Sequence, residues 1–314
     1  MTSVTGPPGA ISGASAARHA RLAGRRRVAA GVGLTLPALA ALGLTMVYPV
    51  LWTLWLSLNG PGTAMRGAPD FRGLENYARI AGSAQFQQAL WQTMGLVAAS
   101  FVLEAILGLA VALAIHRGLR GSRVFRAIVA LPLMVAPVVG ALAWRFIFVD
   151  DYGMIDSLMG VFGAEGPPWF ADIWLARLSV VIANLWMALP FDILVLLAGL
   201  ASLPTDPIEA AQVDGASPGQ ILLAITLPLL KPVIAVILVV RLADAFRIFD
   251  VVYVLTGSGP ANSTDVLSTF IYRQMFTVLD FPGGAAAAVL LVLITAGLSL
   301  LAVLLLRPRT GSLE

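Results

Sequence analysis

The residues of this sequence that could most readily contact a solute are charged side chains inside a long apolar segment. Arg241, Asp244 and Arg247 follow one another at a spacing of three, and the row continues to Asp250. An ionisable group in hydrocarbon is costly and usually faces a cavity or a partner. The spacing permits neighbouring ion pairs but rotates each step by about 60°, so all four cannot share one narrow stripe. The row is either a self-neutralising ladder that packs its helix or a lining for a solute path.

A second polar group lies in an earlier apolar run and consists of Asn184, Trp186 and Asp192, with Pro190 among them. Pro190 is expected to kink the helix and to free backbone carbonyls. Sugars are commonly held by hydrogen bonds to their hydroxyls and by an aromatic face, and these residue types supply both. The alternative is that they join neighbouring helices or anchor the interface. Glu104 is more isolated, and we expect it to be an acid that packs helices.

The chain contains no pattern of catalytic or metal-binding residues. It has no cysteine, and its two histidines, His19 and His116, are far apart, so neither thiolate nor imidazole clusters can form. The only lysine, Lys231, precedes a proline and belongs to no phosphate-binding loop. No nucleophile elbow or zinc-protease motif occurs. We expect no enzyme activity, no catalytic residue, no metal and no cofactor in this chain.

The composition places the chain in a bilayer. Of its 314 residues, 59% are hydrophobic and 12% charged, with a mean hydropathy of +0.88. The basic residues, which give an isoelectric point near 9.7, sit at the ends of apolar runs, so nucleic acid is not an expected partner. The apolar runs are long enough to cross about 30 Å of hydrocarbon and predict an all-α polytopic protein with six spans. The predicted spans are about 28–58, 89–115, 124–148, 174–200, 232–255 and 285–306.

The placement of arginine predicts the orientation of these spans. The basic residues gather on one side, whereas the loop at 149–173 contains five acids and no basic residue. Cytoplasmic loops carry the excess of basic residues. We therefore expect a protein of the cell membrane with both termini in the cytoplasm, the N-terminus as a disordered tail at 1–27 and the C-terminus as a short tail at 307–314. The loop at 201–231 should be cytoplasmic as well. The basic residues that fix this side are Arg117, Arg120, Arg123, Arg126, Lys231, Arg307 and Arg309.

The loop at 201–231 carries start and stop signals for two short helices. Asp206 can cap a helix that has Pro207 at its first position and Glu209 reaching back, and Gly215 can end it. Ser217, Pro218 and Gln220 repeat the pattern, which predicts a second helix that stops near Pro228. The loop is therefore a helix-turn-helix suited to docking.

The same loop carries a resemblance to a known family. Glu209-Ala-Ala, Asp214-Gly-Ala and Ile225-Thr-Leu-Pro228 resemble, in order and spacing, the cytoplasmic EAA loop of ABC importer permeases. The segment Arg241–Pro260 and Tyr48-Pro49 resemble the sugar-permease group that includes maltose, glycerol-phosphate and trehalose systems. The resemblance covers nearly all of the chain after about residue 30. Leu222, where an aromatic is common, and Ser258, in place of a glycine, depart from it.

The resemblance implies the type I importer architecture and a set of partners. These are a second permease subunit in a heterodimer, a dimeric ATPase that binds ATP and Mg, an extracytoplasmic sugar-binding protein, and membrane lipid. Glu209 would contact the ATPase, or would only cap its helix, while Gly215 would allow the turn and the alanines close helix approach. The residues implied in coupling are Glu209, Ala210, Ala211, Asp214, Gly215 and Ala216.

Other functions stay open at this point. An ABC permease for another solute, such as a glycerophosphodiester, a polyamine or a peptide, would have the same spans and loop. An ion-coupled secondary transporter should show inverted repeats with interrupted helices in matching halves, and no such pair is visible. A membrane enzyme would need a cluster of acid-base or nucleophilic residues, and this sequence shows none. The preferred function is carbohydrate import, with trehalose or a related disaccharide favoured only by the resemblance over Arg241–Gly257.

Overall fold

The computed structural model describes residues 35–61, 70–118, 121–246 and 248–306 of the chain. Within them the regular structure is helical, apart from an isolated antiparallel bridge between Asn59 and Phe71, so the predicted all-α class is confirmed. The elements are η1 (Gly43–Val47), α2 (Tyr48–Ser57), α4 (Glu75–Ala81), α5 (Ala84–His116), α6 (Ser122–Ala130), η2 (Leu131–Met134), α7 (Pro137–Phe148), α8 (Met154–Val161), α9 (Ile173–Ala201), α10 (Asp206–Val213), α11 (Pro218–Ile221), η3 (Leu222–Thr226), α12 (Leu227–Ala245), α13 (Phe249–Leu255), η4 (Pro260–Asn262), α14 (Leu267–Phe276) and α15 (Phe281–Leu306).

The chain forms two compact units, Met1–Trp55 and Leu56–Glu314. In the first unit the described residues form a helix that extends from Thr35 through η1 into α2. Its side chains are mostly exposed. Tyr48, Trp52 and Trp55 stack in sequence along it, with ring centroids 6.3 and 4.8 Å apart. Its length and apolar composition are those of a membrane span.

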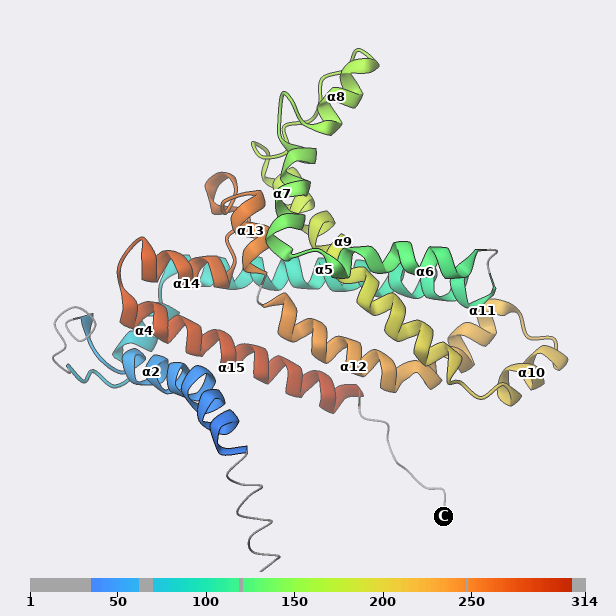
Figure 1. Ribbon diagram of the computed structural model, residues 1–314, viewed down its shortest axis with the longest axis horizontal. Helices are drawn as coiled ribbons and strands as arrows, with labels where there is room; N and C mark the ends of the chain where they lie inside the picture. The colour runs from blue at the N-terminus through green and yellow to red at the C-terminus, as the bar shows by residue number, and fades with distance from the viewer. Residues whose placement is uncertain (1–34, 62–69, 119–120, 247, 307–314) are drawn as a thin grey trace, which may run out of the picture. The chain divides into compact units, whose positions relative to one another are not determined.

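Three long helices of the second unit, α5, α9 and α12, hold the polar residues of the apolar runs. α5 packs along α9, and α12 contacts both (Figure 1). Small residues allow the close approach. A Cβ placed on Gly199 of α9 would lie 2.9 Å from a methyl carbon of Val233 in α12, closer than such contacts normally come. The apolar cluster between these helices is formed by Ala112, Ile115, Ile193, Leu196, Leu197, Leu200, Leu230 and Ile237.

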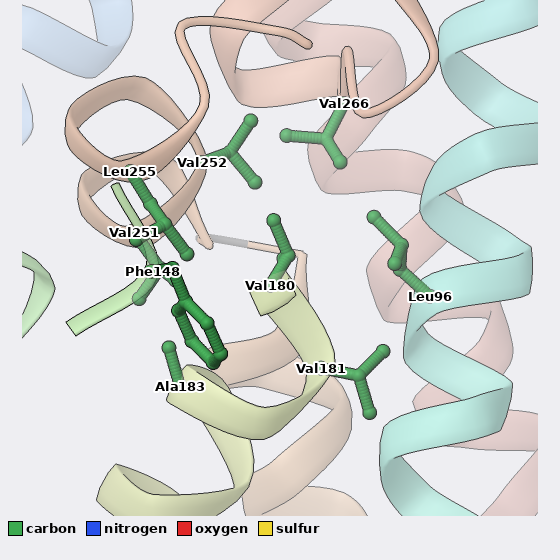
Figure 2. Close-up of a cluster of buried hydrophobic side chains, with 9 residues drawn as sticks. All are labelled: Leu96, Phe148, Val180, Val181, Ala183, Val251, Val252, Leu255 and Val266. Atoms are coloured by element: carbon green, nitrogen blue, oxygen red, sulfur yellow. The ribbon is translucent and has the colours of Figure 1, made fainter. Parts of the chain in front are cut away.

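A second buried cluster packs the other half of α9 against α13. Figure 2 shows Val180 and Ala183 of α9 together with Phe148 of α7 and Leu255 of α13. Leu96 of α5 completes the cluster on the opposite side of α9. β-Branched and aromatic side chains dominate this cluster, and burying each contributes roughly 1.5–3 kcal/mol relative to exposure in water. α9 is thus fixed at both ends by packing, which positions the polar residues between them.

The long apolar helices match the six predicted spans in number only if a bent pair of helices is counted as one span, and some boundaries differ. Five described helices could each cross a membrane: Thr35–Ser57, Ala84–His116, Ile173–Ala201, Pro218–Asp244 and Phe281–Leu305. The predicted span at 124–148 is instead a pair, Val124–Met134 and Pro137–Phe148, bent by 102°. Pro137 begins its second half after Val135 and Ala136 adopt extended backbone, because the residue before a proline avoids the helical region. The predicted tails, 1–27 and 307–314, lie outside the described residues.

The fifth span differs from the predicted 232–255. The helix starts at Pro218, where Ser217 caps it, and runs through the π-helical turn η3 into α12. It therefore does not stop near Pro228, which falls in the first turn of α12. At the other end it stops at Ala245, and α13 begins separately at Phe249. Consequently the expected row from Arg241 to Asp250 is not carried by one helix.

Candidate functional site

Arg241 of α12 is the centre of a polar cluster inside the apolar frame. Its Nε lies 2.7 Å from Oδ1 of Asp192 on α9 and donates a hydrogen bond to it. Its Nη2 donates to the backbone carbonyl of Ala188. The side chain of Asp192 is only 3% exposed. A buried carboxylate needs a charged and hydrogen-bonded partner, so the pair joins α9 firmly to α12.

Two further carboxylates approach the same guanidinium at a longer distance. Oε2 of Glu104, on α5, lies 3.9 Å from Arg241 Nε, and Oδ2 of Asp244 lies 3.9 Å from its Nη1. Glu104 is buried, whereas the Asp244 side chain is 56% exposed. Asn184 donates a hydrogen bond of 3.3 Å to Glu104. The cluster therefore contains one guanidinium and three carboxylates, and it presents more acceptors than cations.

The cluster lines a small cavity. A cavity of about 50 Å³ opens between α5, α9 and the end of α12, and its polar lining comes from Ser100, Glu104, Asn184, Arg241 and Asp244. A second cavity of about 150 Å³ is lined by Glu104 and Asp192 and otherwise by apolar residues. Glu104 therefore lines both cavities. The first cavity is well below the roughly 300–1,000 Å³ of ligand pockets, so in this state it admits only a hydroxyl group or two to the carboxylates.

Phe191 adds an aromatic face to the cluster. The guanidinium carbon of Arg241 lies 4.9 Å from the centroid of the Phe191 ring, which is a cation–π contact. The sequence prediction missed Phe191 and Ala188, because an apolar residue within an apolar span carries no signal of its own. Glu104, which the sequence predicted to be an acid that packs helices, does contact Asn184 of α9 and Arg241 of α12 from α5.

The predicted site residues are only partly brought together. Asn184, Asp192, Arg241 and Asp244 belong to the cluster, but Arg241 pairs most closely with Asp192 and not with Asp244. Trp186 does not line the cavity and packs edge-on against Trp144 of α7, with ring centroids 6.1 Å apart. Two residues beyond Asn184, it falls on the opposite side of α9. Arg247 lies outside the described residues.

The loop after α9 forms the predicted helix-turn-helix. Gly215 has φ +79° and ends α10, while Gly215 N–H donates to Gln212 and Ala216 N–H to Ala211, the Schellman arrangement. Ser217 N–H donates to Gln220 Oε1 at 2.7 Å, and Gln220 N–H donates to Ser217 Oγ at 3.4 Å, so this capping box is confirmed.

The expected cap on the first of these helices is wrong. α10 already includes Asp206, and Thr205, which precedes it, makes no capping hydrogen bond with its side chain. Glu209 is exposed, and its carboxylate forms no ion pair or hydrogen bond with another described residue, so this carboxylate is available to a partner. Ala210 and Asp214 are also exposed, as is the apolar Val213, which the sequence prediction did not include. Ala211 and Ala216 are half-buried.

No group of three or more metal-ligating side chains occurs among the residues that the structure describes. The fold and site together define a class, namely helical membrane proteins with a buried polar cluster and an exposed helix-turn-helix between two spans. The family of binding-protein-dependent transport system inner membrane components matches residues 104–311. The chain therefore belongs to this family of permeases.

Relatives agree with this assignment, and a solved structure shares the fold. The chain is 37% identical over 265 residues to the trehalose/maltose transport system permease protein MalF of Thermococcus litoralis, covering 84% of this chain and 89% of the relative. It is 37% identical over 258 residues to the trehalose transport system permease protein SugA of Mycobacterium tuberculosis, covering 82% of each. A chain of a bacterial alginate ABC transporter, crystallised with an alginate pentasaccharide-bound periplasmic protein, superposes with a TM-score of 0.77. That superposition covers 91% of this chain and 97% of the other at 23% identity, and it shows the common fold.

Proposed function

We propose that this permease is the membrane-spanning subunit of an ATP-driven importer of neutral sugars. The observation that carries the proposal is the cavity lined by Glu104, Asn184, Arg241 and Asp244 at the centre of the helical frame. The cavity lies between α5, α9 and α12, whose other lining residues are mostly apolar. These four residues therefore place hydrogen-bonding groups inside apolar helices. Such groups are costly in a membrane and mark solute paths. The names of the relatives, which include trehalose and maltose permeases, support a sugar.

The chemistry of the cluster favours an uncharged, hydroxyl-rich solute over a phosphate ester. Carboxylates outnumber guanidinium groups, so a phosphate would meet more negative than positive charge. Sugar hydroxyls can donate to Glu104 and Asp244 and accept from Asn184 and Arg241. Phe191 offers an apolar face beside them. Glycerophosphodiesters are therefore disfavoured.

The remaining parts of the transporter belong to other chains. A separate ATPase dimer would bind ATP and Mg and would dock on the loop 201–231 through Glu209, Ala210, Ala211, Asp214, Gly215 and Ala216. A second permease would complete the pathway, and an extracytoplasmic binding protein would deliver the sugar. The exposure of Glu209, Val213 and Asp214 supports docking at α10. In this arrangement both termini are cytoplasmic and the membrane domain covers residues 28–306.

Uptake of radiolabelled trehalose into cells that lack the chromosomal copy of this permease tests the function. The wild-type chain should restore uptake, and maltose should compete. Asn184→Leu should lower uptake roughly tenfold at limiting sugar, because one polar partner left unmatched costs about 1–3 kcal/mol. Thr295→Val is the matched control, since this α15 hydroxyl donates only to Leu291 of its own helix. Uptake that depends equally on both positions would argue against the cavity as the sugar site.

A polyamine is the second candidate, and the excess of carboxylates around Arg241 is the observation that favours it. Cations would be attracted to Asp244, which is largely exposed at the edge of the cavity. Adding unlabelled spermidine to the same uptake assay separates the two. If spermidine competes and maltose does not, the proposed substrate would be a polyamine and not a sugar.

A further inference from the structure

A cavity of about 490 Å³ lies behind the helix-turn-helix of the loop at 201–231. Its walls come from the end of α5, from the end of α9 and the residues after it, and from α10, α11 and η3. The volume is in the range of roughly 300–1,000 Å³ that is typical of small-molecule sites. We call this space the loop cavity. It shares no lining residue with the two cavities of the polar cluster, so it is a separate site.

Most of the lining of the loop cavity is apolar. Gln212 and Thr226 add uncharged polar groups, and no carboxylate lines the space. His116 and Arg117 complete the polar part at the end of α5. The large aliphatic side chains come from every wall and are Leu113, Leu200, Leu203, Ile208, Ile221 and Leu222.

The nitrogen donors of the loop cavity have no acceptor from the protein. The side chains of His116 and Arg117 are exposed, and neither forms an ion pair or a side-chain hydrogen bond with another described residue. A guanidinium is always charged and donates readily to phosphate oxygens, and an imidazole N–H can donate beside it. The loop cavity therefore combines an apolar interior with donors for an anion at one edge.

The loop cavity lies at the depth of the lipid headgroups. Three of the helices that could cross a membrane have an end at its walls, at His116, Ala201 and Pro218. The end of a span marks the boundary between hydrocarbon and the headgroup region. Basic pockets between membrane helices at this boundary are suited to anionic headgroups.

The lining favours a lipid over a segment of a partner protein. A polypeptide that entered the loop cavity would bring backbone N–H and C=O groups, each of which needs a hydrogen-bond partner when it is buried. Gln212 and Thr226 are the uncharged polar side chains available to it. An acyl chain needs no such partner, and a phospholipid carries its phosphate next to its acyl chains.

We propose that the loop cavity binds one anionic phospholipid of the membrane, with its phosphate at Arg117 and His116 and the start of an acyl chain against the aliphatic lining. The absence of a lining carboxylate leaves the cation of a choline or ethanolamine headgroup without a partner, so an anionic headgroup such as that of phosphatidylglycerol is preferred. The lipid would lie between the end of α5 and the Ile208 and Gln212 side of α10. It would therefore help to fix the position of the loop.

The test uses the intact transporter, extracted in mild detergent and incubated with equal amounts of phosphatidylglycerol and phosphatidylcholine. Native mass spectrometry measures the phospholipid that stays bound, and the wild type should retain phosphatidylglycerol in preference. Arg117→Gln should weaken this binding about fivefold, the factor expected for one basic side chain at an anionic lipid, and Arg117→Lys should keep most of it. Leu203→Trp should also weaken binding, because the indole fills part of the apolar space without changing the charge. Arg126→Gln is the matched control, since this exposed arginine of α6 does not line the loop cavity.

Several results would overturn the lipid site. Equal retention of both lipids by the wild type would remove the preference for an anionic headgroup, and an equal loss in Arg126→Gln would show that the lipid follows overall surface charge. Displacement of the lipid by excess glycerol 3-phosphate would show that the loop cavity takes a water-soluble anion. Arg117→Gln with unchanged lipid but less co-purified ATPase would show that a partner protein enters it. Lipid retention needs neither sugar nor ATP, so failure of the sugar uptake assay would reject the proposed function and leave this test intact.

Discussion

The buried carboxylate of Asp192 is stabilised by a single guanidinium, that of Arg241. Arg241 donates to its carboxylate and, from another nitrogen, to the carbonyl of Ala188 in the same helix. Glu104 accepts a hydrogen bond from Asn184, and Asp244 is largely exposed, so neither relies on Arg241 to the same degree. The acids around Arg241 are therefore unequal, and substitutions should reveal the difference.

Arg241→Leu should strand the Asp192 carboxylate and cost about 3–5 kcal/mol, seen as lower membrane abundance and a lower melting temperature. Adding Asp192→Leu should recover much of the loss, because the stranded charge is gone. Adding Asp244→Leu is the control and should recover little. Greater recovery with Asp244→Leu than with Asp192→Leu would contradict the pairing across α9 and α12.

At the scale of elements, the turn between α10 and α11 depends on one backbone conformation. Gly215 has φ +79°, a region that costs an L-residue roughly 1–2 kcal/mol. The space around it is open, since an added Cβ would meet nothing within 4 Å. Conformation, and not crowding, therefore selects glycine here.

Gly215→Val should distort the α10–α11 turn, reduce co-purification of the ATPase and lower transport, while leaving the amount of permease in the membrane unchanged. Gly219→Val is a matched control, because position 219 has equally open space and no positive φ. Gly215→Asn should lie close to the wild type, since Asn tolerates the left-handed region. Equal ATPase recovery from all three variants would argue against docking at this turn.

At the scale of the whole molecule, the proposed orientation places two exposed loop positions on opposite sides of the membrane. Cysteine introduced by Ser217→Cys should react with an impermeant maleimide only from the cytoplasmic side, and by Ala164→Cys only from outside. The natural chain has no cysteine, so no background labelling occurs. Labelling of both positions from the same side would contradict the proposed topology.

The sequence predicted those features whose causes are local. Apolar length predicted the helices, and the order of Ser217, Pro218 and Gln220 predicted a capping box that the structure contains. The pairing of Arg241 with Asp192 could not be predicted, since the two lie 49 positions apart and meet only because of how α9 and α12 are rotated against each other. The same limit applies to Ala245, where the helix ends without a proline or glycine signal.

The helical segment from Pro218 to Asp244, which includes the π-helical turn η3 and Pro232, connects the capping box of the loop to the guanidinium of the polar cluster. Pro218 and Arg241 are about 35 Å apart along such a helix at 1.5 Å per residue. A tilt of about 10° at one end would displace the other by roughly 6 Å over that length. This exceeds the 2.7 Å that separates Arg241 from Asp192. A movement of the loop that this helix transmits over its whole length would therefore separate Arg241 from Asp192, which would couple the position of the loop to the integrity of the polar cluster.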